Sequence, residues 1–373
     1  MTQPSLDDLL QIMVKERASD LILKTGGCPA MRVAGQIRFL GDLPMEGQQL
    51  KRFLGDIVPQ AERQQFLAHG AADVAVNKPG IGRFRCNAFV VGGQIGFVFR
   101  AIQESIPSFK DLNLPVDQLR RLAGLPRGLV LATGIAGSGK STTLAAMVEH
   151  VNRTHAKHII TIEDPIEFMF EDRRSIVNQR EVGSDAPTFA EALRHAVRQS
   201  PDVIMIGEMR DRETMEAAIN AAETGHLVFS TLHTVNAVQT VERIISFFPP
   251  HQHELIRLQL ALNLQGVISL RLIKTKEGRS QMPAVELLIN TPSVRDHLER
   301  GETRALPKAL TEGGYYGTMT FNQSLIRLYN AGNISFDEAL EASDNPDELK
   351  LHMRGITRGG QNVTGDRPMP TAP

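Results

Sequence analysis

Residues 134–141 form an octapeptide whose glycines, lysine and serine are spaced for binding nucleotide phosphates. They read Gly134-Ile135-Ala136-Gly137-Ser138-Gly139-Lys140-Ser141. In this G-x-x-x-x-G-K-[ST] pattern, glycines let backbone N–H groups turn toward phosphate oxygens. The Lys140 ammonium reaches the β- and γ-phosphates, and the Ser141 hydroxyl is a ligand for Mg²⁺. The octapeptide, with Thr142 after it, therefore predicts a site for ATP and Mg²⁺.

Polar side chains follow three apolar stretches further along the chain, at the points where we expect strands to end. Glu163 and Glu167 follow the stretch 158–162, Glu208 follows 203–206, and His233 follows 227–232. In open α/β sheets, ligands bind at the carboxyl ends of the strands. These side chains are therefore expected to converge on the phosphate loop.

The chemistry of phosphoryl transfer assigns candidate roles to these groups. Mg²⁺ prefers hard oxygen ligands, so Glu208 is a candidate metal ligand beside Ser141, directly or through water. Glu163, Glu167 and Glu208 are all candidates for orienting or deprotonating the attacking water, and the sequence does not choose among them. His233 is a candidate for a hydrogen bond to the γ-phosphate.

The stretch before Glu208 departs from the usual form of a metal-binding strand end. Such strands end in Asp, often followed by Glu, whereas here Gly207 holds the Asp position and Asp202 precedes the strand. His226 begins the strand that ends before His233, so it is expected to lie farther from the phosphates.

Arg83, Arg85 and Arg100 lie on neighbouring predicted strands in the first part of the chain. Period-two alternation places Arg83 and Arg85 on one face of a sheet. They are either a solvated basic face or arginines that complete a nucleotide site, including that of a neighbouring subunit. Charge alone favours the first interpretation.

The elements that must position these residues fall into two patterns. Residues 1–104 show a helical pattern over 5–17, two polar helices within 46–69, and strands that predict a small α/β domain with an antiparallel sheet. Residues 105–118 are typical of an interdomain linker. Residues 119–356 alternate buried strands with helices and predict a mostly parallel sheet. Residues 357–373 are rich in Gly, Pro and polar residues and predict a disordered tail.

The bulk composition excludes several classes of function. The chain has 373 residues, 41 Lys plus Arg, 42 Asp plus Glu, and no Trp. A net charge of −1 and scarce aromatic residues argue against nucleic-acid binding. Two cysteines, Cys28 and Cys86, provide neither a disulfide framework nor a four-cysteine zinc site. No apolar run reaches the length of a membrane span and no signal peptide is recognisable, so we expect a cytoplasmic protein.

The ordered set of motifs resembles the secretion ATPases of type II secretion systems and type IV pili. The phosphate loop resembles their Walker A motif, and three later segments resemble their Asp box, atypical Walker B motif and His box. These segments are Thr161-Ile162-Glu163-Asp164-Pro165-Ile166-Glu167, Asp202-Val203-Ile204-Met205-Ile206-Gly207-Glu208-Met209-Arg210, and Ala222-Glu223-Thr224-Gly225-His226-Leu227-Val228-Phe229-Ser230-Thr231-Leu232-His233-Thr234. Within that family the chain is most similar to the type IV pilus retraction ATPases, the PilT and PilU group, because residues 319–325 match and the four-cysteine metal motif is missing.

The resemblance implies a homohexameric ring in which a PAS-like first domain and a RecA-like P-loop ATPase domain shift as ATP is hydrolysed. It implies phosphate-contacting roles for Arg83, Arg85 and Arg100. It also implies work on the pilus machinery at the inner face of the cytoplasmic membrane, with a platform protein there as partner and, for a PilU-type motor, a paralogous retraction ATPase.

Two segments depart from the retraction pattern. Leu270 stands where these proteins usually have Gln, and residues 294–300 match their helical retraction motif only loosely. An accessory retraction ATPase, a motor for pilus extension or type II secretion, and a regulatory nucleotide-binding subunit therefore stay as alternatives.

Overall fold

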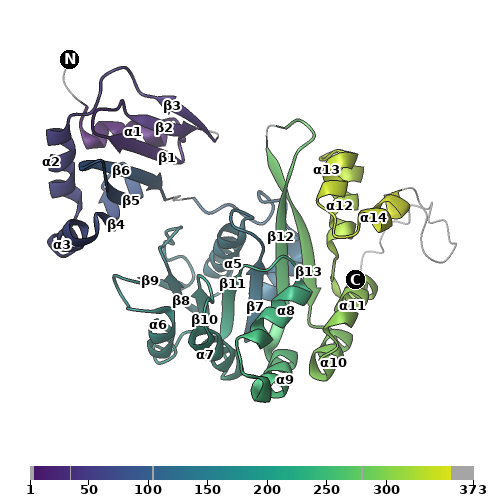
Figure 1. The fold of residues 1–373 in the computed structure, drawn as a ribbon. Coiled ribbons are helices and arrows are strands. Elements are labelled where there is room, and N and C mark those ends of the chain that lie inside the picture. Colours follow the sequence, from purple (N-terminus) through teal and green to yellow (C-terminus); the bar gives the residue numbers. More distant parts are fainter. Residues whose placement is uncertain (1–3, 34, 103–104, 279, 354–373) are drawn as a thin grey trace. The chain divides into compact units, whose positions relative to one another are not determined.

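The computed structural model describes residues 4–33, 35–102, 105–278 and 280–353 (Figure 1). The chain divides into two compact units. The first contains the described residues up to Ser105 together with the short segment Glu167–Met169, and the second contains the other described residues. The predicted tail at 357–373 lies outside the described residues.

The first unit is an antiparallel sheet of six strands in the order β3-β2-β1-β6-β5-β4. Its strands are β1 (Asp20–Lys24), β2 (Ala30–Val33), β3 (Gln36–Phe39), β4 (Ala71–Lys78), β5 (Gly82–Val91) and β6 (Gln94–Ala101). Its helices are α1 (Leu6–Lys15), α2 (Gly47–Ile57) and α3 (Gln60–His69). These elements confirm the antiparallel sheet and the helices expected from the sequence.

One hydrophobic core holds this unit together. The helix α1 begins at a capping box, in which the Ser5 hydroxyl accepts from the Asp8 N–H and the Asp8 carboxylate accepts from the Ser5 N–H. Its spacing of apolar residues buries Leu10 and Met13 against side chains such as Phe97 on the sheet. The alternation along β5 buries every second residue on the same side, which leaves the other face of the strand for polar residues.

The second unit is built on a sheet of seven strands in the order β13-β12-β7-β11-β10-β8-β9. All neighbouring pairs are parallel except β12 with β13. The strands are β7 (Gly128–Thr133), β8 (His158–Glu163), β9 (Ile176–Glu181), β10 (Val203–Ile206), β11 (Leu227–Leu232), β12 (Leu264–Lys274) and β13 (Gln281–Ile289). The four central strands β7, β8, β10 and β11 confirm the sequence-based expectation, whereas β9, β12 and β13 were not predicted.

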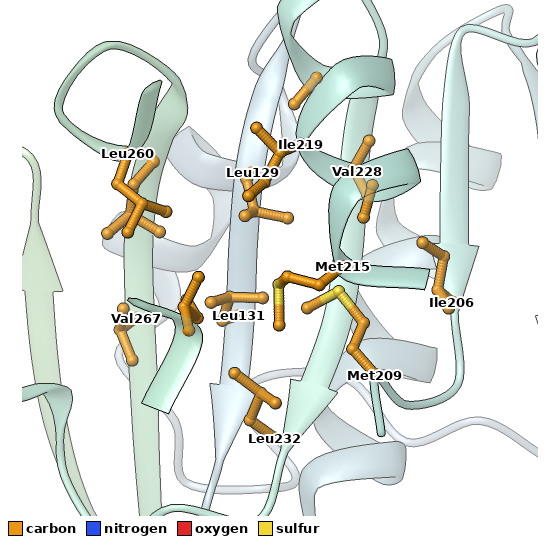
Figure 2. Close-up of a cluster of buried hydrophobic side chains, with 14 of the residues drawn as sticks. Leu129, Leu131, Ile206, Met209, Met215, Ile219, Val228, Leu232, Leu260 and Val267 are labelled. Atoms are coloured by element: carbon orange, nitrogen blue, oxygen red, sulfur yellow. The ribbon is translucent and has the colours of Figure 1, made fainter. Parts of the chain in front are cut away.

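Helices cover both faces of this sheet (Figure 1), which explains why its central strands are largely apolar and almost completely buried. The helices are α4 (Val116–Ala123), α5 (Lys140–Thr154), α6 (Phe189–Ala196), α7 (Arg212–Glu223), α8 (Ala237–Ser246), α9 (His253–Asn263), α10 (Pro292–Arg300) and α11 (Leu306–Glu312). Figure 2 shows Met215 and Ile219 of α7 packed near Leu129, Leu131 and Val228 of the sheet.

A third cluster joins the C-terminal helices to the β12–β13 hairpin. Residues of α12 (Phe321–Asn330), α13 (Phe336–Glu341) and α14 (Pro346–Met353) pack with Ile273 of β12 and Ala284 of β13. Short 3-10 turns lie at Pro250–Gln252, Thr303–Ala305 and Gly313–Tyr316. In the described part of the chain, no helix is long and apolar enough to cross a lipid bilayer.

Candidate nucleotide site

The carboxyl ends of the central strands lie side by side on one edge of the second unit's sheet. In the strand register, Ile206 pairs with Ile162 on one side and with Ser230 on the other, and Leu232 pairs with Thr133. The residues that follow these strands therefore share one edge, as the sequence predicted for the phosphate loop, Glu163, Glu208 and His233.

The phosphate loop uses its glycines for backbone conformations that other residues rarely adopt. Gly134 has φ 145°, Gly137 φ 76° and Gly139 φ 93°. A Cβ atom on Gly134 would lie 2.6 Å from the Leu270 carbonyl oxygen and would also collide with Ser138. Gly134 is therefore required both by its conformation and by the close approach of β12.

The groups inside the loop are suited to an anion. Lys140 is buried, and its Nζ donates to the carbonyl oxygens of Gly134 (2.9 Å) and Ile135 (2.8 Å). The buried Ser138 hydroxyl has no hydrogen-bond partner among the described residues. No described side chain caps α5, which begins at Lys140, so its first N–H groups point toward the loop. A buried hydroxyl, an ammonium and a helix N-terminus together fit a bound phosphate.

Glu208 and His233 meet at the neighbouring strand ends. His233 Nε2 lies 3.4 Å from Glu208 Oε2, and the Arg210 guanidinium pairs with Glu208 Oε1. The Glu208 carboxylate is mostly buried, whereas the side chains of Arg210 and His233 are more than half exposed. Arg210 and His233 also line a cavity of about 580 Å³ that extends to α8.

Glu163 is buried beside this cluster at the end of β8. Its Oε1 accepts hydrogen bonds from the Thr161 hydroxyl at 2.7 Å and from Gln179 Nε2 at 3.3 Å. The N–H of Gly207 donates to the Ile162 carbonyl at 2.8 Å, which ties the strand ends before Glu163 and Glu208 together. A Cβ on Gly207 would make only ordinary contacts, so the missing Asp at this position is not forced by lack of space.

Glu167 follows β8 in the sequence but lies in a different compact unit from Glu163. The segment Glu167–Met169 belongs to the first unit, where Arg83 Nη1 donates to Met169 Sδ at 3.0 Å. Glu167 and Arg83 therefore belong to the same compact unit.

Arg85 and Arg100 are cross-strand neighbours, and both are engaged by carboxylates of the first unit. They pair in the register between β5 and β6. Arg100 donates from Nε to Asp20 Oδ1 at 2.9 Å, and its Nη2 lies 2.8 Å from the same oxygen. Asp20 also pairs with Arg32 at 3.4 Å, and Arg85 pairs with Asp73 at 3.6 Å. The first domain thus contains a charged network that sequence reasoning described only by its arginines.

Asp202 and His226 lie at the opposite edge of the sheet, before β10 and β11. Burial raises the pKa of Asp202, but hydrogen bonds from the His158 N–H and from Lys157 outweigh it and hold that pKa below its ordinary value. His226 Nδ1 lies 2.9 Å from the Ala221 carbonyl oxygen. The expected separation of His226 from the phosphate loop is confirmed.

Arg210 and Gln179 are site residues to which the sequence gave no role. Arg210 lies two positions after Glu208, and that spacing is the only local signal for their ion pair. Gln179 lies on β9, an unpredicted strand.

Among the described residues, no group of three or more His, Cys, Asp or Glu side chains could hold a metal ion. Ser141 and Glu208 supply hard oxygen donors at the phosphate loop and at a nearby strand end, which fits Mg²⁺ held mainly by nucleotide phosphates.

Comparisons with known proteins agree with the motifs. A family model described as Type II/IV secretion system protein matches residues 92–314. The Pseudomonas aeruginosa type IV pilus ATPase PilU is 38% identical to this chain over 97% of the chain and 98% of that protein. The type IV pilus retractation ATPase PilT of the same organism is 42% identical over 92% of the chain and 99% of that protein.

A solved structure supports the same assignment at the level of the fold. The crystal structure of the pilus retraction motor PilT with bound ADP matches with a TM-score of 0.88 and 41% identity, over 93% of this chain and 99% of that one. These matches confirm the α/β fold class and the resemblance that the motifs indicated. The chain belongs to the Type II/IV secretion system protein family.

Proposed function

We propose that this protein is the ATP-hydrolysing motor of type IV pilus retraction. One observation carries the proposal: a phosphate loop with a buried, unpartnered Ser138 hydroxyl lies on the same sheet edge as the Glu208–His233 pair. The similarity to a pilus retraction motor that binds ADP supports the same nucleotide chemistry here. The substrates are ATP, with Mg²⁺, and water.

The residues of the phosphate loop bind the nucleotide. The backbone N–H groups of residues 135–142 and the Ser138 hydroxyl surround the phosphates, and Lys140 neutralises charge on the β- and γ-phosphates. Ser141 and, directly or through water, Glu208 hold Mg²⁺, which offsets the negative charge that the phosphate oxygens develop during transfer. Lys140 must exchange its two loop carbonyl partners for phosphate oxygens.

The strand-end cluster acts on the water. Glu208 is fixed by Arg210 and His233, and it orients the attacking water with Glu163 as the second candidate. His233 donates to the γ-phosphate and senses its release. Glu167, which packs with the first unit, is the weakest of the three carboxylate candidates.

The first unit contributes in a ring of subunits. We assign residues 1–104 to a PAS-like domain, 105–118 to a linker, 119–356 to a RecA-like ATPase domain and 357–373 to a tail. Arg83, Arg85 and Arg100 contact phosphates in a homohexamer, where Arg100 must first leave Asp20. The ring works at the cytoplasmic face of the membrane against a platform protein of the pilus machinery.

A PilU-type accessory role is the second candidate. The relative named PilU aligns with 97% of this chain, compared with 92% for the relative named PilT. An accessory motor would hydrolyse ATP at the same site but would depend on a paralogous motor for retraction.

Deletion of the gene tests the proposal and separates these roles. Loss of a retraction motor gives cells that carry excess pili and do not twitch, and wild-type protein restores twitching while a Lys140→Ala variant does not. Cells without pili would contradict retraction and indicate an extension motor. Residual twitching, together with ATPase activity that rises when a paralogous motor is added, would indicate the accessory role.

A further inference from the structure

Three adjacent strands carry a row of polar side chains, two buried and one half-buried, that leads away from the phosphate loop. Thr133, the residue before Gly134, pairs in register with Ser269 of β12, and Ser269 pairs with Glu286 of β13. The Thr133 hydroxyl donates to Ser269 Oγ at 3.0 Å, and Ser269 Oγ lies 3.5 Å from Glu286 Oε1. Thr133 and Ser269 are fully buried. The row therefore connects the strand entering the phosphate loop with one carboxyl group.

The same carboxyl oxygen holds the start of helix α8. The Ala237 N–H, at the first position of α8, donates to Glu286 Oε1 at 2.7 Å. Asn236 caps the helix from its own side by accepting from the Gln239 N–H at 2.9 Å. A carboxylate at a helix N-terminus is favoured both by an otherwise unpaired N–H and by the helix dipole.

The loop between His233 and α8 has few residues and is held from several sides. The Thr234 and Thr240 hydroxyls lie 2.7 Å apart. Arg271 of β12 donates to the Val235 carbonyl at 3.5 Å, and its Nη2 lies 2.7 Å from Asp344 Oδ1. Because only three residues separate His233 from Ala237, a displaced α8 terminus displaces His233.

We propose that Glu286 is a positioning residue. It holds the loop between His233 and α8 in a fixed position relative to β7, the strand that leads into the phosphate loop. It touches neither nucleotide nor water and acts through Ala237 and Ser269. This inference rests on the proposed ATPase function, because it assigns Glu286 to the alignment of the two halves of that site.

The surroundings of Glu286 make this link sensitive to pH. The carboxyl is densely surrounded by protein atoms, and this burial raises its pKa to about 7. The Ala237 N–H, Arg271 and Ser269 oppose the increase, and Asp344 adds to it. The ionised carboxylate accepts hydrogen bonds from the Ala237 N–H and the Ser269 hydroxyl better than the protonated carboxyl does. The loop after His233 is therefore held best above neutral pH.

Steady-state kinetics of Glu286 variants test the proposal. Glu286→Ala removes the acceptor and is expected to lower kcat by about 10-fold or more, the effect of one charge-assisted hydrogen bond, while the Kd for ADP stays within about 3-fold. Glu286→Gln keeps an acceptor oxygen without the charge, so its kcat is expected to lie between those of Glu286→Ala and wild type and to lack the wild-type rise through pH 7. Glu277→Ala, at an exposed position in the turn between β12 and β13, is the matched control.

A double-mutant cycle separates positioning from a general loss of structure. In a His233→Ala background, Glu286→Ala is expected to lower kcat by less than about 2-fold further, because both changes remove the same function. Full additivity, an unchanged kcat in Glu286→Ala, or a Gln variant no better than Ala would overturn the proposal. If Glu286→Ala is insoluble, Ser269→Ala is used and its kcat loss must likewise vanish without His233. A wild-type protein without ATP turnover would instead refute the ATPase function itself.

Discussion

Glu208 shows how a single carboxylate is prepared for its role by its neighbours. It is mostly buried, and it is held by Arg210 on one oxygen and by His233 on the other. Two donors with positive or potentially positive charge fix the orientation of a carboxylate more firmly than one. We therefore choose Glu208 as the first of the candidate glutamates to test for orienting water.

Replacement of Glu208 by Gln tests this role. The change preserves shape but removes the charge and the basic oxygen, so ATP hydrolysis is expected to fall by about 10²–10⁴-fold. Nucleotide binding is expected to persist, because Lys140 and the loop N–H groups are unchanged. Phosphate release and titration with a fluorescent ATP analogue measure the two effects. Glu191→Gln, at an exposed site on α6, is the control, and a loss of ATP binding by Glu208→Gln would contradict the assigned role.

At the scale of the element, the phosphate loop depends on how closely β12 approaches it. The Leu270 carbonyl oxygen would lie 2.6 Å from a Cβ atom on Gly134, whereas a Cβ on Gly137 would meet nothing within 4 Å. Both glycines have positive φ, so only Gly134 combines an unusual conformation with a lack of space.

These two glycines give a matched pair of variants. Gly134→Ala must displace the loop from β12 and is expected to weaken ADP binding by about 10-fold or more, the effect of moving one or two charge-assisted hydrogen bonds. Gly137→Ala places an alanine in the left-handed conformation without a collision, which lowers stability by about 1–2 kcal/mol and is expected to have a smaller effect on affinity. Isothermal titration with ADP and thermal unfolding compare them. Equal losses of affinity would show that space beside Leu270 is unimportant.

The elements recognised from the sequence are those with a local signal. The strands β7, β8, β10 and β11 are rich in apolar residues, and the phosphate loop is one contiguous motif. Four of the six residues of β9 are polar and none is fully buried, so no alternation or apolar run marks this strand. The strands β12 and β13 are interrupted by polar residues and so are not continuous apolar runs. They pair with each other along most of their length, a contact that the sequence pattern does not reveal.

The site residues likewise divide into those that a local sequence signal predicts and those held by contacts distant in the sequence. The strand-end rule was sufficient to bring Glu163, Glu208 and His233 to one edge. It gave no role to Glu286, whose partners Ser269 and Ala237 are distant in sequence, and it did not indicate that the segment containing Glu167 groups with the first unit. The pairing of Arg100 with Asp20 is likewise a contact between distant strands, with no local signature.

At the scale of the whole molecule, the raised pKa of Glu286 links stability to pH. Its ordinary value is 4.5 and its value in the folded protein is about 7. Between these values the folded protein retains a proton that the unfolded chain releases, so stability falls as pH rises through this window and then stays constant. The loss is at most about 3 kcal/mol.

Denaturant unfolding at several pH values checks this linkage. The free energy of unfolding of the wild type is expected to decrease relative to that of Glu286→Gln from pH 5 to pH 7. Above pH 8 the difference between the two proteins is expected to stay constant. Parallel curves over the whole range would show that Glu286 titrates normally in the folded protein.

Hydrolysis of ATP at the phosphate loop is the central property proposed for this protein. Comparison of phosphate release by wild-type protein and a phosphate-loop variant tests it. Phosphate release is measured with ATP and Mg²⁺ for purified wild-type protein, Lys140→Ala, and Lys308→Ala as a control at an exposed lysine. Lys140 is the buried cation of the loop, so its loss is expected to reduce turnover to background, while Lys308→Ala behaves as wild type. Wild-type turnover by Lys140→Ala would contradict the account.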